Sequence, residues 1–201
     1  MMQMFEGKKI VLFGAHPDDI ECGMGGTLNQ LVKYQPKIVV FADTIQYNGD
    51  VIRDEFQNSM KTQEVSGELY SFEVDNMEKD KVEMRRKIYE YRDYDIIFSP
   101  SKHSQHQDHR MIGQAVDDIM LEKTVFYYED IRSGQHEIVN FWNSLSEEDM
   151  EAKYKMIEQY GTQIAKRHYF NTMSIKTMAK FRGGQVNTEY AEGFQVLRLV
   201  L

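Results

Sequence analysis

Short apolar runs alternate with charged, helix-like stretches along most of this chain. Runs such as Ile10-Val11-Leu12-Phe13 and Ile96-Ile97-Phe98 combine β-branched with large apolar residues, which is typical of buried strands. The stretches between such runs are longer and charged, as in residues 80–91, and their spacing is helical. Because strands and helices alternate, we expect a parallel sheet with helices on both of its faces.

The pattern predicts the position of each element. We expect strands at residues 9–15, 37–42, 69–72, 95–99 and 124–128, and helices at about 25–34 (or 27–34), 51–68, 80–91 and 109–121. After residue 128 we expect helices at 146–163 and 174–181, the second ending at Gly183-Gly184, and a last strand at 193–201. The predicted fold class is α/β, Rossmann-like and doubly wound, with a mainly parallel sheet. We expect one domain, residues 1–201, with a core of about 1–128 and a C-terminal extension of helices and a strand, about 129–201, packed on it.

Charge and cysteine content exclude several kinds of partner. The 201 residues carry a net charge of −8, whereas affinity for nucleic acid comes largely from clustered Lys and Arg, so we expect no nucleic-acid partner. The single cysteine, Cys22, excludes an intramolecular disulfide and fits a reducing compartment. No apolar run approaches the ~20 residues that span a bilayer, and residues 1–9 contain no apolar core of a signal peptide. We therefore expect a cytoplasmic protein without membrane insertion.

Two clusters of imidazoles and carboxylates each follow a predicted strand. The first is Ala15-His16-Pro17-Asp18-Asp19-Ile20-Glu21, and the second is His106-Gln107-Asp108-His109. In a doubly wound sheet, ligands bind at the carboxyl ends of the strands where the strand order reverses. The usual order places the first and fourth strands side by side at that point. We therefore expect the two clusters to face each other across one crevice.

Residues of these types are suited to an open metal site. Catalytic zinc typically takes three protein ligands from His, Asp or Glu and leaves one position for water. Bound zinc lowers the pKa of that water to about 7 and polarises a substrate carbonyl. With two adjacent aspartates, Asp18 and Asp19, one carboxylate can face the metal while its neighbour takes the proton of the water. Asp108 is placed to orient an imidazole, and a second histidine, protonated, to stabilise an oxyanion.

The two clusters closely resemble the paired motifs of the zinc-dependent N-acetylglucosaminyl deacetylase superfamily, the PIG-L or LmbE-like deacetylases. That family has an A-H-P-D-D-I-E form of its first motif, which is residues 15–21 here, and an H-x-D-H motif, which is residues 106–109. The order of elements to about Tyr128 also matches. Looser similarity to a bacterial branch continues in Tyr127-Tyr128-Glu129, Tyr160-Gly161-Thr162-Gln163 and Tyr190-Ala191-Glu192-Gly193-Phe194.

The resemblance implies a role for each motif residue. It implies that His16, Asp19 and His109 bind Zn²⁺, and that Asp18 is the general base that deprotonates zinc-bound water. It further implies that His106 acts as an acid or oxyanion stabiliser, that Asp108 tunes a neighbouring histidine, and that Arg53 contacts the substrate. The roles of Glu21, Cys22 and Glu192 stay open.

The resemblance also implies an activity. It is that of a hydrolase, a zinc-dependent N-deacetylase acting on an N-acetylated amino sugar of the N-acetylglucosamine type. The sugar carries a nucleotide, a phosphate, a lipid or another aglycone, and the sequence does not separate these. A homo-oligomer, a trimer or a hexamer, suits the family.

Other interpretations compete with this one. An isolated aspartate after a strand is usually a turn or helix cap, and Arg53 is equally compatible with a surface ion pair. A nucleotide-binding α/β protein would use the acidic cluster for Mg²⁺, but Mg²⁺ prefers oxygen to the imidazoles found here. A non-catalytic binding protein with a vestigial metal site has no need of an intact Asp18.

Overall fold

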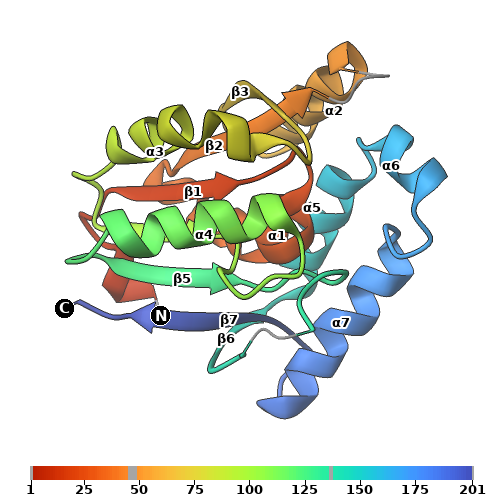
Figure 1. Ribbon diagram of the computed structural model, residues 1–201. Helices are drawn as coiled ribbons and strands as arrows, with labels where there is room; N and C mark the ends of the chain where they lie inside the picture. The colour runs from red at the N-terminus through yellow and green to blue at the C-terminus, as the bar shows by residue number, and fades with distance from the viewer. Residues whose placement is uncertain (1, 45–48, 136–137, 201) are drawn as a thin grey trace.

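A seven-stranded sheet forms the centre of the protein. The computed structural model describes residues 2–44, 49–135 and 138–200. Its strands are β1 (Ile10–Gly14), β2 (Lys37–Thr44), β3 (Gly67–Glu73), β4 (Ile96–Ser99), β5 (Thr124–Tyr128), β6 (Phe141–Leu145) and β7 (Tyr190–Arg198). They are arranged in the order β3-β2-β1-β4-β5-β7-β6. The first five are parallel, and β7 runs antiparallel to both β5 and β6 (Figure 1). The predicted doubly wound, mainly parallel sheet is confirmed.

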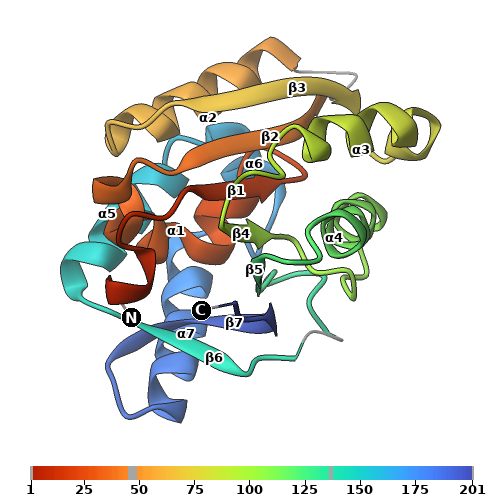
Figure 2. The ribbon, with the colours of Figure 1, turned by 90° about the vertical axis from the view of Figure 1, so that its left-hand side faces the viewer.

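Helices cover both faces of this sheet. The α-helices are α1 (Asp19–Leu31), α2 (Gly49–Thr62), α3 (Lys81–Tyr89), α4 (Gln107–Ile119), α5 (Glu147–Ile157), α6 (Gly161–Lys166) and α7 (Thr172–Gln185). Short 3₁₀ turns are η1 (Met2–Phe5), η2 (Val32–Tyr34) and η3 (Met77–Asp80). Figure 2 shows α3 and α4 on one face and α1 and α5 on the other. Within the described residues, no helix is both long and apolar enough to cross a membrane.

Alternation along the central strand divides the interior into two cores. Ile10 and Leu12 of β1 point into the core beneath α1, whereas Val11 and Phe13 point into the core beneath α3 and α4. All four side chains are almost fully buried. Successive side chains of a strand point to opposite faces, so a strand covered on both faces must be apolar throughout. Each such side chain contributes about 1.5–3 kcal/mol when fully buried.

The strand order brings the two sequence clusters together. β1 pairs with β2 on one side and with β4 on the other, so that Leu12 lies opposite both Ile38 and Phe98. From β1 the chain adds β2 and β3 on one side of the sheet and then β4 and β5 on the other. Doubly wound sheets bind ligands at the position where the strand order reverses in this way, which lies beside β1 here. The first cluster leaves the end of β1 and the second follows β4, as predicted.

The elements differ from the prediction mainly where tertiary contacts set the boundary. α1 begins at Asp19 instead of residue 25 or 27, and α2 ends at Thr62 instead of 68. The predicted helix 146–163 is divided into α5 and α6, because Tyr160 has φ −92° and ψ 60°. α7 continues through Gly183 and Gly184 instead of ending there.

The C-terminal strands were only partly predicted. β7 begins at Tyr190, earlier than residue 193, and residue 201 of that prediction lies outside the described residues. β6 was not predicted, because Phe-Trp-Asn-Ser-Leu has neither a continuous apolar run nor a strict alternation. Among the strands that the structure describes, it pairs with β7 alone and is therefore an edge strand of the sheet, at the end opposite to β3.

Candidate metal centre

Three histidines from the two motifs meet at the carboxyl ends of β1 and β4. The ring centroid of His16 lies 4.7 Å from that of His106 and 5.3 Å from that of His109, and the last two rings are 4.8 Å apart. Each offers a nitrogen within 4.8 Å of the other two. They line a cavity together with Pro17, Asp18, Asp19, Cys22, Gly23, Ile52, Val74, Asp75, Tyr128, Asp130, Arg132, Gln163, Arg167, Tyr169 and Phe170.

Asp18 enters this cavity from a strained backbone position. It is the N-cap residue of α1 with φ 106° and ψ −22°, in the left-handed region that non-glycine residues rarely adopt. Its carbonyl accepts the hydrogen bond of Cys22 N at 2.9 Å, so the unusual conformation joins the end of β1 directly to the helix. Strain of this kind costs about 1–3 kcal/mol and is concentrated at functional sites. The Asp18 side chain is buried among the residues that line the cavity.

The carboxylate of Asp19 lies between two imidazoles. Its Oδ2 is 3.5 Å from His16 Nδ1 and 3.2 Å from His109 Nε2. The backbone amides of Ala15 and His16 donate to the same oxygen at 2.9 and 2.8 Å and fix its position. Two ligand atoms bound about 2.1 Å from a tetrahedral zinc ion lie about 3.4 Å apart. The donor set of His16, Asp19 and His109 therefore fits a divalent metal of this kind.

A further carboxylate lies on the far side of each of the two imidazoles that face Asp19, those of His16 and His109. His16 Nε2 donates to Asp108 Oδ2 at 3.0 Å, which leaves Nδ1 of the same ring to face Asp19. His109 Nδ1 lies 3.5 Å from Asp130 Oδ2, which leaves its Nε2 to face Asp19. Carboxylates in this position orient metal-binding histidines and fix their tautomers.

Asp130 was missed by sequence reasoning, although a weak signal was present. It lies two residues after β5, a parallel strand whose carboxyl end lies at the same edge of the sheet as that of β4. A carboxylate at such a strand end is a candidate by the same rule that selected the two motifs. Asp130 is far from His109 in the sequence, so the sequence did not indicate that the two residues pair.

His106 differs from the sequence expectation in its protonation. Burial, together with the charges of His16 and His109, lowers the pKa of His106 to about 4. Its Nδ1 accepts the backbone N–H of Asp108 at 3.3 Å and caps α4, so the neutral ring carries its proton on Nε2. The protein without metal therefore presents His106 as a neutral hydrogen-bond donor, not as the protonated imidazole that the sequence suggested.

The other titratable groups are shifted by their close contacts. Burial alone would lower the pKa of His16, but the charge of Asp19 and the hydrogen bond to Asp108 outweigh it and raise the pKa to about 10. Burial raises the pKa of Asp18 well above its ordinary value, against the opposing charge of Arg167. Burial acts in the same direction on Asp19, but the charges of His109 and His16 hold the pKa of that carboxyl well below its ordinary value.

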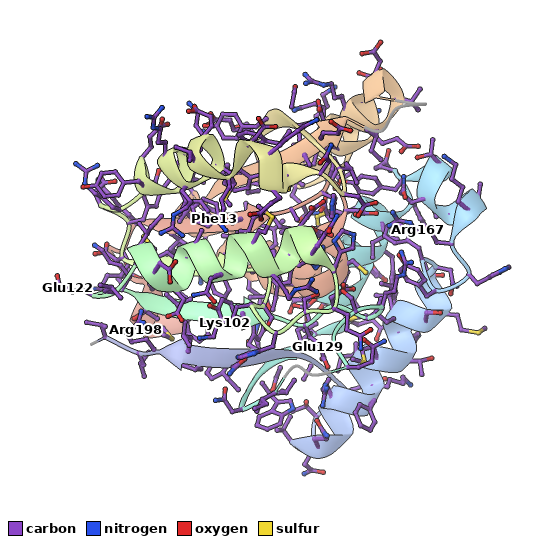
Figure 3. The ribbon with its side chains drawn as sticks, in the orientation of Figure 1. Phe13, Lys102, Glu122, Glu129, Arg167 and Arg198 are labelled. Carbon is purple, nitrogen blue, oxygen red and sulfur yellow. The ribbon has the colours of Figure 1, made fainter. Side chains whose placement is uncertain are left out.

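Arg53, the predicted substrate contact, lies outside the cavity lining, whereas Arg167, for which the sequence provided no expectation, lies beside Asp18. Arg53 is not among the residues that line the cavity; it forms an ion pair with Asp43 and a hydrogen bond to Ser71. Arg167, from the segment between α6 and α7, instead lies 3.2 Å from Asp18 Oδ2. Figure 3 shows Arg167 at the edge of the sheet opposite to Glu122 and Arg198. No motif marks Arg167 in the sequence, so only its position in the fold shows the contact.

The three residues whose roles the sequence left open lie close to the centre. Glu21 is buried and accepts hydrogen bonds from Ser59 and Tyr160. Cys22 lines the cavity as a free thiol, and burial raises its pKa well above the ordinary value. Glu192 of β7 is buried and reaches back to α1.

Comparison with known proteins adds a family and several similar folds. The model of the GlcNAc-PI de-N-acetylase family (PIG-L) matches residues 11–120. The N,N'-diacetylchitobiose deacetylase from Pyrococcus horikoshii is 18% identical with a TM-score of 0.71, covering 96% of this chain and 84% of that one. The 4-carboxy-2-hydroxymuconate hydratase from Pseudomonas putida is 16% identical with a TM-score of 0.80, covering 96% and 98%. The zinc-inhibited form of a teicoplanin deacetylase is 14% identical with a TM-score of 0.73, covering 92% and 96%.

The structural likenesses establish only the fold, because the sequence identities are low and the similar proteins include both deacetylases and a hydratase. The family match is broader evidence, because it covers more than half of the chain and contains both motifs. This chain therefore belongs to the GlcNAc-PI de-N-acetylase (PIG-L) family.

Proposed function

We propose that this protein is a zinc-dependent hydrolase that removes the acetyl group from an N-acetylated amino sugar. The observation that carries the proposal is the position of Asp19 Oδ2 between His16 Nδ1 and His109 Nε2, at distances of 3.5 and 3.2 Å. Nitrogen and carboxylate donors at such spacing suit zinc, whereas Mg²⁺ prefers oxygen donors. This preference argues against the alternative of a Mg²⁺-dependent nucleotide-binding protein.

His16, Asp19 and His109 are the residues that would hold the metal. When bound, zinc supplies an activated water and polarises the carbonyl of the substrate amide. Asp108 keeps the His16 ring in place by accepting a hydrogen bond from its Nε2, and the Asp130 carboxylate faces Nδ1 of His109 at 3.5 Å.

Asp18 is the general base in this proposal. Its carboxyl is buried beside the cavity, and its raised pKa increases its affinity for a proton. It takes a proton from the water that attacks the amide carbon. Asp18 then gives this proton to the amide nitrogen, and the C–N bond breaks to release acetate and a free amine. Arg167 holds the Asp18 carboxyl through a contact of 3.2 Å.

His106 stabilises the developing oxyanion by donating from Nε2. The neutral ring already carries a proton there, because Nδ1 accepts from the backbone. A fixed donor directed at the site of charge development is an effective contribution to catalysis. Protonation of the ring is not needed for this role.

The family, and a similar structure that acts on an acetylated sugar, support the proposed substrate class. The family is defined by a de-N-acetylase, and one similar structure is a diacetylchitobiose deacetylase. We infer a small-molecule substrate of the N-acetylglucosamine type with a substituent that is not assigned. Arg53 stays a predicted substrate contact, although it is paired with Asp43. Cytoplasmic location and a homo-oligomer likewise stay predictions.

An acetate-release assay tests the activity. Purified protein loaded with one equivalent of zinc is incubated with a panel of N-acetylglucosamine conjugates, and acetate and free amine are measured together. We expect equal amounts of the two products from at least one conjugate. Hydration of an unsaturated dicarboxylate is measured in parallel, because a hydratase shares the fold. Hydration without any acetate release would contradict the proposal.

Asp18→Asn tests the assignment of the base. Removal of a general base typically lowers kcat by about 10²–10⁴-fold, while zinc binding should persist because the three proposed ligands are unchanged. The measurement is kcat at saturating substrate together with zinc content. Unchanged kcat in a protein that retains its zinc would exclude Asp18 as the base.

A further inference from the structure

A second group of metal-binding side chains lies beside the first. Asp75, His106 and Asp108 each offer one ligand atom, and these atoms lie within 4.8 Å of one another. Asp75 follows β3, whereas the other two lie at the start of α4. His106 Nε2 is 3.5 Å from Asp75 Oδ1, and the backbone amide of Asp75 donates to Asp108 Oδ2 at 2.8 Å. The three residues are therefore held together independently of any metal.

An unpaired buried oxygen indicates that this group is incomplete. The side chain of Asp108 is fully buried. Its Oδ2 accepts two hydrogen bonds, from His16 Nε2 and from the amide of Asp75, but its Oδ1 has no hydrogen-bond partner. A buried carboxylate oxygen without a hydrogen-bond donor lowers the stability of the folded state, and such an atom indicates an absent ligand. A cation at this position would supply the missing interaction.

We propose that Asp75, His106 and Asp108 form a second divalent-cation site, and that its occupation inhibits the enzyme. One imidazole nitrogen and two carboxylate oxygens are donors that zinc accepts. The site is weaker than the first for two reasons. The Asp75 side chain is 71% exposed and must be ordered, and coordination through His106 Nε2 moves the ring proton to Nδ1, which loses the 3.3 Å hydrogen bond from Asp108 N.

Inhibition is the part of this inference that rests on the proposed function. A cation on His106 removes the Nε2 proton that the proposal assigns to the oxyanion. The same cation also takes Asp108 as a ligand, and Asp108 is the carboxylate that accepts the hydrogen bond of His16. The enzyme should therefore be active with one equivalent of zinc and lose activity in excess zinc, whereas binding of the second cation does not depend on which reaction is catalysed.

Metal stoichiometry tests the site without an activity assay. The full chain is equilibrated with increasing zinc chloride, and bound zinc is measured after separation of free metal. We expect about two zinc ions per chain in the unmodified protein and about one in Asp75→Asn, because a neutral amide is a poor zinc ligand. Asp75 has φ 60°, a conformation that asparagine adopts as readily as aspartate, so the variant should fold normally. Asp93→Asn is the matched control, since Asp93 is an exposed aspartate paired with Lys9.

Two results would overturn the site: an unmodified protein that never binds a second zinc, or an Asp75→Asn variant that still binds two. Activity is then measured against zinc concentration, with each protein expressed relative to its own maximum. The concentration that halves activity should rise at least about tenfold in Asp75→Asn and stay unchanged in Asp93→Asn. Equal inhibition in all three proteins would refute the inhibitory role. If no substrate is deacetylated, the proposed function fails while the stoichiometry still decides the site.

Discussion

At the scale of single residues, two adjacent aspartates are driven in opposite directions by their surroundings. Asp19 faces two imidazoles, whose charges hold its pKa well below the ordinary value. Asp18, turned away by a backbone φ of 106°, is dominated by burial, which raises its pKa. Environments that separate the pKa values of neighbouring groups assign them different chemical roles. In the proposed mechanism, this strained residue is what allows one dipeptide to supply both a metal ligand and a general base.

His16 leads to a prediction about the pH dependence of metal uptake. Its pKa is raised to about 10, so the ring is protonated at neutral pH in the metal-free protein and must release that proton to bind zinc. Zinc affinity should rise about tenfold per pH unit between about pH 7 and 9. Calorimetry in buffers of different ionisation enthalpy should detect about one proton released per zinc at pH 8. Affinity independent of pH over this range would contradict the shift.

The same shift has a consequence for stability without metal. Because the folded-state pKa of His16 lies above the ordinary value of 6.5, its contribution to stability is fully present below pH 6.5. That contribution is lost as the pH rises toward 10. Asp108→Asn, which removes one of the groups that raise the pKa, should reduce both the pH dependence and the proton release.

At the scale of secondary structure, the close approach of α4 to the loop after β4 positions three site residues. His106, Asp108 and His109 all lie at the start of α4. Gly113, in the middle of this helix, lies against the loop backbone: a Cβ there would be 2.4 Å from Lys102 N and 2.7 Å from Pro100 O. Glycine therefore sets the distance between the helix and the end of β4.

Gly113→Ala should destabilise the protein and disturb the site. The contacting atoms are backbone atoms that cannot rotate away, and overpacking of this kind costs about 1–3 kcal/mol. We expect a lower midpoint of denaturant unfolding and weaker zinc binding. Gly184→Ala is the control: it lies in α7 with open space around it, and alanine there should stabilise the helix by about 0.5–1 kcal/mol. If both variants had the same stability, Gly113 would not set the helix position.

At the scale of the whole molecule, the C-terminal strand is bonded to the first helix. Within α1, Met24 has φ −146° and ψ 28°, which interrupts the helix. Glu192 of β7 accepts the backbone amides of Gly26 and Thr27 at 3.0 and 2.7 Å, and Lys153 of α5 donates to the same carboxylate at 2.6 Å. The ion pair is almost fully buried. α1 thus carries Asp19 on a helix that is held in place by the end of the chain.

Glu192→Ala should therefore destabilise the protein strongly. Removing one partner leaves the Lys153 ammonium buried without compensation, which costs about 3–5 kcal/mol, and leaves two amides unpaired. The measurement is the free energy of unfolding in denaturant. Glu189→Ala serves as the control, because the Glu189 carboxylate is 66% exposed and 3.8 Å from Lys180, and its loss should change stability by less than about 0.5 kcal/mol. Similar losses in both variants would exclude a special role for Glu192.

The parallel sheet and the residues of the two motifs could be predicted from the amino-acid sequence alone. Strand and helix periods are local properties of the chain, so the apolar run of β1 and the cluster that follows it could be recognised without coordinates. The family resemblance then identified His16, Asp19 and His109 as a set, and the sheet topology explains why they meet. The single-domain prediction and the individual roles stay predictions.

The distant groups that complete the site became apparent from the folded arrangement of the chain. Asp130 behind His109, Arg167 beside Asp18, and Glu192 beneath α1 carry no sequence motif, and Arg53 lies against Asp43 instead of lining the cavity. The protonation of His106 likewise depends on two rings brought close by folding. These contacts join residues far apart in the chain, and their geometry is set by how helices pack on the sheet. The local pattern of apolar and polar residues determines where strands and helices form. Packing of the helices on the sheet determines which polar groups are buried and come into contact.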